Sequence, residues 1–210
     1  MIEIINGYKK EILSKRIVLI SILIICSLGL LFGSLYLTIL NNDEKKEVLD
    51  VVSNYFYSFK DISFSDKLSI FKDSLFSNLI YYIIIWSLGI SILGLPIIFI
   101  MIFFKSFTIG FSIASIFAKY RFKGLIGILV YIFPSVLINL FITVILGTYS
   151  CILSIKLVRD SFSKKSLNFG SFMGRYFLLL LLIIILVVIC SIFDAFISPI
   201  LYKLFVKSIK

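Results

Sequence analysis

The residues with the chemistry to act in this chain are a few polar side chains set inside long apolar runs. Lys105 is the only charged residue in positions 79–118. A charge at mid-bilayer costs roughly 2.5–3.5 kcal/mol on insertion scales, so such a residue is a functional candidate. Two interpretations stay open: an intramembrane functional lysine, or a lysine that marks the cytoplasmic end of a longer span and extends its ammonium group to the interface.

Two further polar residues lie in or beside apolar runs. Asn139 follows Pro134 within the next apolar stretch. Its amide can hydrogen-bond backbone that the proline leaves unpaired, or a neighbouring helix, so we expect a structural role. Asp194 ends the last apolar run, and we expect it at the membrane interface rather than buried.

No residue pattern indicates catalysis or metal binding. The chain has no histidine, which excludes a His-based triad and argues against a zinc site. Cys26, Cys151 and Cys190 lie in apolar stretches without CxxC spacing, and packing is their expected role. Phosphate-binding glycine loops, HExxH and paired intramembrane carboxylates are missing as well. We therefore expect no catalytic residue, no cofactor, no metal and no enzymatic activity.

The composition explains why so few residues are candidates. The chain has 210 residues, of which 60% are hydrophobic and 15% charged, and its mean hydropathy is +1.13. These values exclude a disordered chain and argue against a soluble domain. The net charge of +10 belongs to basic residues that flank apolar spans, which indicates cytoplasmic loops rather than a nucleic-acid partner.

We predict an all-α, polytopic membrane bundle of about five transmembrane helices, with 1–210 as a single membrane domain. The predicted order is a cytoplasmic N-terminus (1–16), an uncleaved first span (17–40), an extracytoplasmic region (41–78), spans two to four (79–157), a basic cytoplasmic loop (158–175) and a last span (176–195).

Prolines predict broken or kinked elements near Pro96 and Pro134. Around Pro96, one interpretation is two spans, roughly 77–95 and 97–118, joined by a tight apolar turn. The other is one long span followed by a re-entrant segment, 106–118. We favour two spans, although this order places the basic residues of 119–123 outside, against the positive-inside trend. A short half-helix before Pro134 is expected to precede the fourth span.

The region 41–78 is the main polar segment, and its seven acids exceed its five lysines by two. Apolar residues at i, i+3, i+4, i+7, i+8 and i+11 predict an amphipathic helix. This face either packs on the bundle and the lipid surface or docks an external partner; its residues are Val48, Val51, Val52, Tyr55, Phe56 and Phe59. A second amphipathic stripe begins at Phe64, with Ser63 or Ser65 as N-cap, and is expected to run into the next span.

Small residues four positions apart predict close helix contacts. Gly29 and Gly33 form a GxxxG pattern in the first span, and Gly110 and Ala114 repeat the spacing in the third. Such pairs let a second helix approach closely.

Three stretches together resemble the stage II sporulation protein M family: residues 86–111, 147–157 and 174–199. The resemblance extends over nearly the whole chain and assigns these family-motif positions: Gly89, Gly94, Pro96, Lys105, Gly110, Pro134, Asn139, Gly147, Lys156, Gly174, Arg175, Tyr176, Asp194 and Pro199. The wider family often carries His and Gly after the proline, and then a Glu. This chain has Ser135, Val136 and Asn139 instead, which weakens the transfer of a proton- or ion-handling role.

The resemblance implies a multi-pass cell-membrane protein at the sporulation septum and the engulfing mother-cell membrane of an endospore former. Its implied role is a non-enzymatic scaffold that anchors two peptidoglycan-degrading partners, stage II sporulation proteins D and P. The alternative is a membrane subunit of a transporter or permease-like complex, because broken helices and a membrane lysine are features of transporter sites. The oligomeric state is left open.

Overall fold

The computed structural model describes residues 2–59, 63–127, 133–163 and 169–209. Its helices are α1 (Ile2–Ile39), α2 (Asn42–Ser58), α3 (Phe64–Gly89), α4 (Gly94–Gly127), α5 (Phe133–Ser163), α6 (Phe169–Ile192), the π-helix η3 (Phe193–Ile197) and α7 (Ser198–Ile209). The described part of the chain contains no strand, and the predicted all-α bundle is confirmed.

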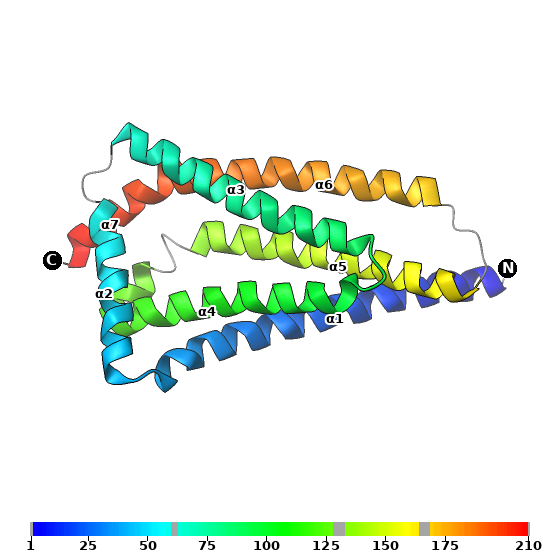
Figure 1. The fold of residues 1–210 in the computed structure, drawn as a ribbon, viewed down its shortest axis with the longest axis horizontal. Helices are drawn as coiled ribbons and strands as arrows, with labels where there is room; N and C mark the ends of the chain where they lie inside the picture. The colour runs from blue at the N-terminus through cyan, green and yellow to red at the C-terminus, as the bar shows by residue number, and fades with distance from the viewer. Residues whose placement is uncertain (1, 60–62, 128–132, 164–168, 210) are drawn as a thin grey trace.

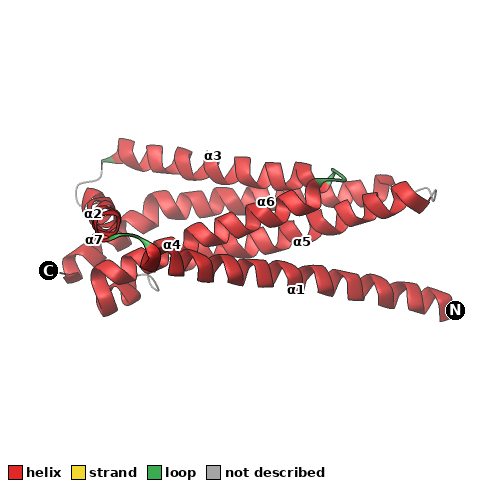
Figure 2. Ribbon diagram, turned by 60° about the horizontal axis from the view of Figure 1, so that its bottom comes forward, coloured by secondary structure: helices red, strands yellow, loops and turns green. Residues whose placement is uncertain are grey.

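Five helical segments are long and apolar enough to cross a membrane: Lys15–Ile39, Phe64–Gly89, Gly94–Gly124, Pro134–Arg159 and Met173–Leu204. They run roughly along one direction, and α2 lies across one end of the bundle beside the C-terminus (Figure 1). We call this the α2 end. The N-terminus lies at the opposite end, as do the end of α5 and the beginning of α6 (Figure 1). Rotated, the bundle shows α3 and α1 on opposite sides (Figure 2).

The predicted close helix contact lies between α1 and α4. A Cβ built on Gly29 would lie 2.7 Å from the carbonyl oxygen of Phe103. One built on Gly33 would lie 2.8 Å from the carbonyl carbon of Phe107, and one on Gly110 would lie 2.9 Å from the carbonyl carbon of Leu30. Because these neighbours are backbone atoms, the two helices can pack this closely only with glycine at the contact.

Both prolines near the predicted breaks stand at the beginning of helices. Pro96 lies in the first turn of α4, and Pro134 is the second residue of α5. The missing N–H of proline leaves no helical bond unmade there. Residues 90–93 form the turn between α3 and α4, so there are two helices here, as the two-span interpretation predicts, and the re-entrant one is wrong. The predicted position of the turn near Pro96 is wrong by a few residues, because Gly94 and Pro96 already belong to α4. The predicted half-helix before Pro134 falls partly on residues 128–132, which lie outside the described residues.

A kink in α4 falls within the basic stretch 119–123. Arg121 has φ 54° and ψ −134°, and a positive φ is unfavourable for a residue with a side chain. At this end of α4, Lys119 Nζ lies 3.2 Å from a carboxylate oxygen of Asp50 on α2. One acidic residue of α2, Asp50, therefore supplies counter-charge to this basic stretch.

The last span does not end at Asp194. The helix continues through η3 into α7, and the Ser198 N–H donates to the carbonyl of Phe193, five residues back. A wider turn at this point accommodates Pro199, which has no N–H to donate to the preceding turn. The extra residue per turn changes the direction in which the following side chains project.

Candidate functional site

Lys105 lies inside α4, about a third of the way along it, and does not mark the end of a longer span. The preceding helix ends at Gly89 and α4 begins at Gly94, which places Lys105 about 16 Å along α4 at 1.5 Å per residue. Its Nζ donates to Asn78 Oδ1 at 3.0 Å and lies 4.7 Å from the centre of the Tyr81 ring. Lys105 therefore binds groups on α3 within the bundle.

A chain of polar contacts extends from Lys105 to Asp194. Asn78 Nδ2 donates to the carbonyl of Ser74 at 2.9 Å and reaches the Ser74 hydroxyl at 3.5 Å. The Ser74 hydroxyl in turn donates to Asp194 Oδ2 at 2.9 Å. One cation and one carboxylate, on α4 and η3, are thus bridged through two polar side chains of α3. Asp194 is half-buried against α3, not exposed at an interface.

Asn139 makes the interhelical bonds that its sequence position predicts. The buried Tyr82 hydroxyl donates to the Asn139 carbonyl at 2.9 Å, and it lies 3.1 Å from Asn139 Oδ1. The Asn139 amide also donates to the carbonyl of Ser135 on the same helix at 3.0 Å. These contacts join α3 to α5, and they satisfy groups that would be costly to leave unpaired in lipid.

A second contact joins α3, α5 and α6 nearer the N-terminal end. The rings of Trp86 and Tyr176 stack with centroids 5.4 Å apart. The Tyr176 hydroxyl donates to the Trp86 carbonyl at 2.8 Å and lies 2.7 Å from the Ser150 hydroxyl. Gly89 leaves room for this contact, because a Cβ there would collide with the Tyr176 hydroxyl and approach Ser150 Cα to 2.9 Å.

At the α2 end, part of the predicted docking face of α2 is buried in the bundle and part of it is exposed. Phe56 and Phe59 are buried and pack on Tyr202 of α7, with ring centroids 5.5 and 4.8 Å apart respectively. They are therefore removed from the predicted docking face. Val51 is 62% exposed and Tyr55 is 54% exposed, while Val48 and Val52 are half-buried.

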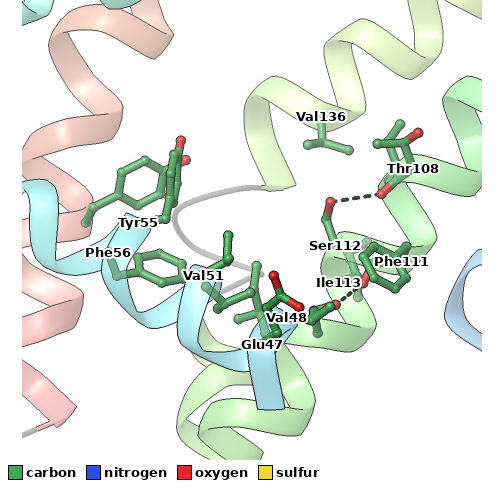
Figure 3. Close-up of a pocket in the computed structure, with 15 residues that line it drawn as sticks. Glu47, Val48, Val51, Tyr55, Phe56, Thr108, Phe111, Ser112, Ile113 and Val136 are labelled. Carbon is green, nitrogen blue, oxygen red and sulfur yellow. Dashed lines mark hydrogen bonds between the residues drawn. The ribbon is translucent and has the colours of Figure 1, made fainter. Parts of the chain in front are cut away.

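The remaining residues of that face line a cavity of about 580 Å³ between α2, α4, α5 and α7. In Figure 3, Val51 and Tyr55 of α2 lie on one side of the cavity, and Thr108, Ser112 and Ile113 of α4 lie on the other. The Ser112 hydroxyl donates to the carbonyl of Thr108 at 2.9 Å, so this hydroxyl is satisfied within its own helix. The cavity is mainly apolar, with Glu47 among its lining residues.

The chemistry of these sites is polar bonding and apolar packing. Among the described residues, no three His, Cys, Asp or Glu side chains come together in a group that could hold a metal. Cys26, Cys151 and Cys190 are free and buried, as expected of packing residues. Desolvation, together with the negative charge of Asp194, raises the pKa of Tyr55, which lies outside the spans.

The comparison with protein families decides the identity of this bundle. The family model described as stage II sporulation protein M matches residues 20–199. The chain belongs to the stage II sporulation protein M family. Neither the curated proteins nor the solved structures contain a match. Membership makes this a sporulation-related, multi-pass membrane protein.

The family-motif positions do not form one site. Lys105 and Asp194 belong to one polar network, Asn139 to the bonds between α3 and α5, and Gly89 and Tyr176 to the stacked contact. Gly94, Gly147 and Pro199 serve packing: Gly94 approaches the carbonyl of Leu88, Gly147 faces Ile102, and Pro199 is buried. Gly174, inside α6, has open space where a Cβ would lie and makes no such contact. Lys156 and Arg175 line a pocket at the N-terminal end.

Four partners of these residues were not predicted from the sequence: Ser74, Asn78, Tyr82 and Trp86. All four lie on α3 at positions 74, 78, 82 and 86. A spacing of four places them along one face of a helix. That polar and aromatic stripe in an apolar span is the signal that could have identified α3 as the central partner helix.

Proposed function

We propose that this chain is a non-enzymatic membrane scaffold that anchors and localises peptidoglycan-degrading partners during endospore formation. The proposed partners are stage II sporulation proteins D and P, and the proposed location is the septal membrane and then the engulfing mother-cell membrane. Family membership supports the sporulation role. The observation that supports anchoring is an amphipathic helix, α2, fixed across one end of the bundle with apolar residues still exposed.

The proposed orientation places the N-terminus in the cytoplasm and α2 outside, where peptidoglycan lies. The spans at the N-terminal end begin or end in cations, among them Lys15, Arg16, Arg159 and Arg175. At the α2 end, Lys119 is paired with Asp50, so the basic residues there are partly compensated. Cytoplasmic loops carry the excess of Lys and Arg, and this asymmetry supports the orientation.

The fixed position of α2 supports its use as a docking element. Phe56 and Phe59 hold its C-terminal half against α7, and the aromatic pairs are each worth about 0.5–1.5 kcal/mol beyond their buried area. Because α2 is ordered before a partner arrives, binding would not incur the entropy cost of ordering it. Val51 and Tyr55 supply an apolar contact, and Glu47 and Asp50 supply acidic groups beside it.

Partner localisation in cells tests this proposal. Val51→Glu places a charge on the exposed apolar face, and Asn54→Glu places the same charge on an exposed position elsewhere on α2. With fluorescent partners, we expect Val51→Glu to lower their enrichment at the septum several-fold and Asn54→Glu to leave it unchanged. Equal enrichment in both variants would mean that this face of α2 does not recruit them.

A second candidate function, a membrane subunit of a transporter, is supported by the Lys105–Asn78–Ser74–Asp194 network. Intramembrane charges often mark ion or proton routes. The variant Lys105→Gln distinguishes the two proposals. If the network is structural and the chain is a scaffold, partner recruitment stays normal in this variant. If the chain is a transporter subunit, transport is lost although the protein still inserts and assembles.

A further inference from the structure

Three cationic side chains from three different helices line one pocket at the N-terminal end of the bundle. Lys15 comes from α1, Lys156 from α5 and Arg175 from α6. The pocket measures about 390 Å³, and no Asp or Glu is among the described residues that line it. A basic pocket between transmembrane helices is the kind of site that binds an anionic headgroup.

The remaining lining residues give the pocket an apolar side. They are Tyr149, Ile152, Tyr176 and Leu179. Tyr176 is fixed by its bonds to Trp86 and Ser150, so the wall next to Arg175 is held in place. Ile152 is buried and Leu179 half-buried. A ligand that fills this pocket therefore needs both a negative group and an apolar group.

The depth of the three cations matches that of phospholipid headgroups. Lys15 precedes the uncharged stretch 17–40, Lys156 follows the uncharged stretch 124–155, and Arg175 directly precedes the uncharged stretch 176–193. Each cation therefore stands at the edge of a long uncharged run. Cations at the edges of apolar spans are placed where they can reach the headgroup region of a bilayer.

We propose that this pocket binds the phosphate of an anionic phospholipid in the leaflet at the N-terminal end. Arg175 supplies a planar guanidinium that can hold phosphate oxygens through two parallel bonds, and Lys15 and Lys156 add positive charge. The first part of the acyl chain lies along Ile152 and Leu179. The bound lipid connects α1, α5 and α6 at the N-terminal end of the bundle.

Lipid retention measured by native mass spectrometry tests this proposal. The full chain is reconstituted in phosphatidylcholine nanodiscs containing one-tenth phosphatidylglycerol, then extracted, and its bound lipids are identified. Each cation near an anionic surface changes binding about fivefold, so Lys156→Gln with Arg175→Gln is expected to lower phosphatidylglycerol retention about thirtyfold. The single variant Arg175→Gln is expected to lower it about fivefold, and it provides a milder change if the double variant folds poorly.

The matched control removes two exposed cations elsewhere, with Lys72→Gln and Lys203→Gln on α3 and α7. Retention in this control is expected to equal that of the unmodified chain. Equal retention in the pocket variants and the control would overturn the proposal. Displacement of phosphatidylglycerol by millimolar inorganic phosphate would also overturn it, because the site would then bind a free anion rather than a lipid.

Discussion

Replacing glycine by alanine is expected to have opposite effects on stability at two positions. Gly33 lies in the close contact between α1 and α4, whereas Gly174 lies in open space on α6. Gly33→Ala places a methyl group 2.8 Å from the carbonyl carbon of Phe107 and 2.9 Å from the amide nitrogen of Phe111. Gly174→Ala places the same methyl group where nothing lies within 4 Å. Both glycines are in helices, so the change in intrinsic helix preference is the same.

The expected magnitudes follow from these distances. Replacing Gly by Ala in a helix favours the helix by up to about 1 kcal/mol. At Gly33 the methyl group would collide with the carbonyl oxygen of Phe107 and lie 2.8 Å from its carbonyl carbon, and no side-chain rotation relieves contact with backbone. Overpacking typically costs about 1–3 kcal/mol. Because the backbones of α1 and α4 must move apart to admit this methyl group, we expect a net loss of about 2 kcal/mol for Gly33→Ala and a small gain for Gly174→Ala.

Thermal unfolding in detergent, followed with a thiol-reactive fluorescent dye, measures both variants. Cys26, Cys151 and Cys190 are buried, so the dye reacts as the bundle opens. Gly33→Ala should unfold at a lower temperature than the unmodified chain, and Gly174→Ala at the same or a higher temperature. If Gly33→Ala unfolds no earlier than Gly174→Ala, the close contact between α1 and α4 is not present in the protein.

Two further predictions concern the polar network and the attachment of α2. Lys105→Met removes the donor to Asn78 Oδ1 and should cost about 1–3 kcal/mol. In a double-mutant cycle of unfolding temperatures, Lys105→Met with Asp194→Leu should cost less than the sum of the single changes; additive effects would show that the two charges are not coupled. Tyr202→Leu removes the contacts of the Tyr202 ring with Phe56 and Phe59. Because these contacts hold α2, the rate of tryptic cleavage within α2 should rise several-fold. Unchanged cleavage would contradict the role of Tyr202 in holding α2.

The sequence predicted those parts of the fold that depend on local patterns. Apolar run length predicted the five spans, and the spacing of Gly29 and Gly33 predicted a close contact without identifying α4 as its other side. Ser63 was a predicted N-cap, and its hydroxyl accepts from the Asp66 amide at 3.3 Å. Each of these features depends on residues within a few positions of one another.

The features that were missed depend on long-range contacts or on unusual backbone. Ser74 and Asp194 are 120 residues apart, and no periodicity in either helix shows that they meet. Pro96 and Pro134 predicted breaks because a proline inside a helix breaks it, whereas at the beginning of a helix it is tolerated. The actual irregularities are the positive φ of Arg121 and the π-helix before Pro199. Of these, only the second has a proline beside it as a local signal.

The proposed anchoring of peptidoglycan-degrading partners depends on the exposed apolar face of α2. Two tyrosines of the same helix provide a matched test, because Tyr55 is 54% exposed at the cavity and Tyr57 is 52% exposed on another face. Only Tyr55 lines the cavity. Replacement of either one by alanine removes the same side chain from a similarly exposed position.

The measurement is co-purification of the tagged full chain from sporulating cells in detergent, with mass spectrometry of the recovered proteins. We predict that stage II sporulation proteins D and P are recovered with the unmodified chain and with Tyr57→Ala, and are reduced several-fold with Tyr55→Ala. Recovery of neither partner with the unmodified chain would contradict the proposed anchoring role. Equal recovery with Tyr55→Ala and Tyr57→Ala would contradict the role of the exposed apolar face of α2.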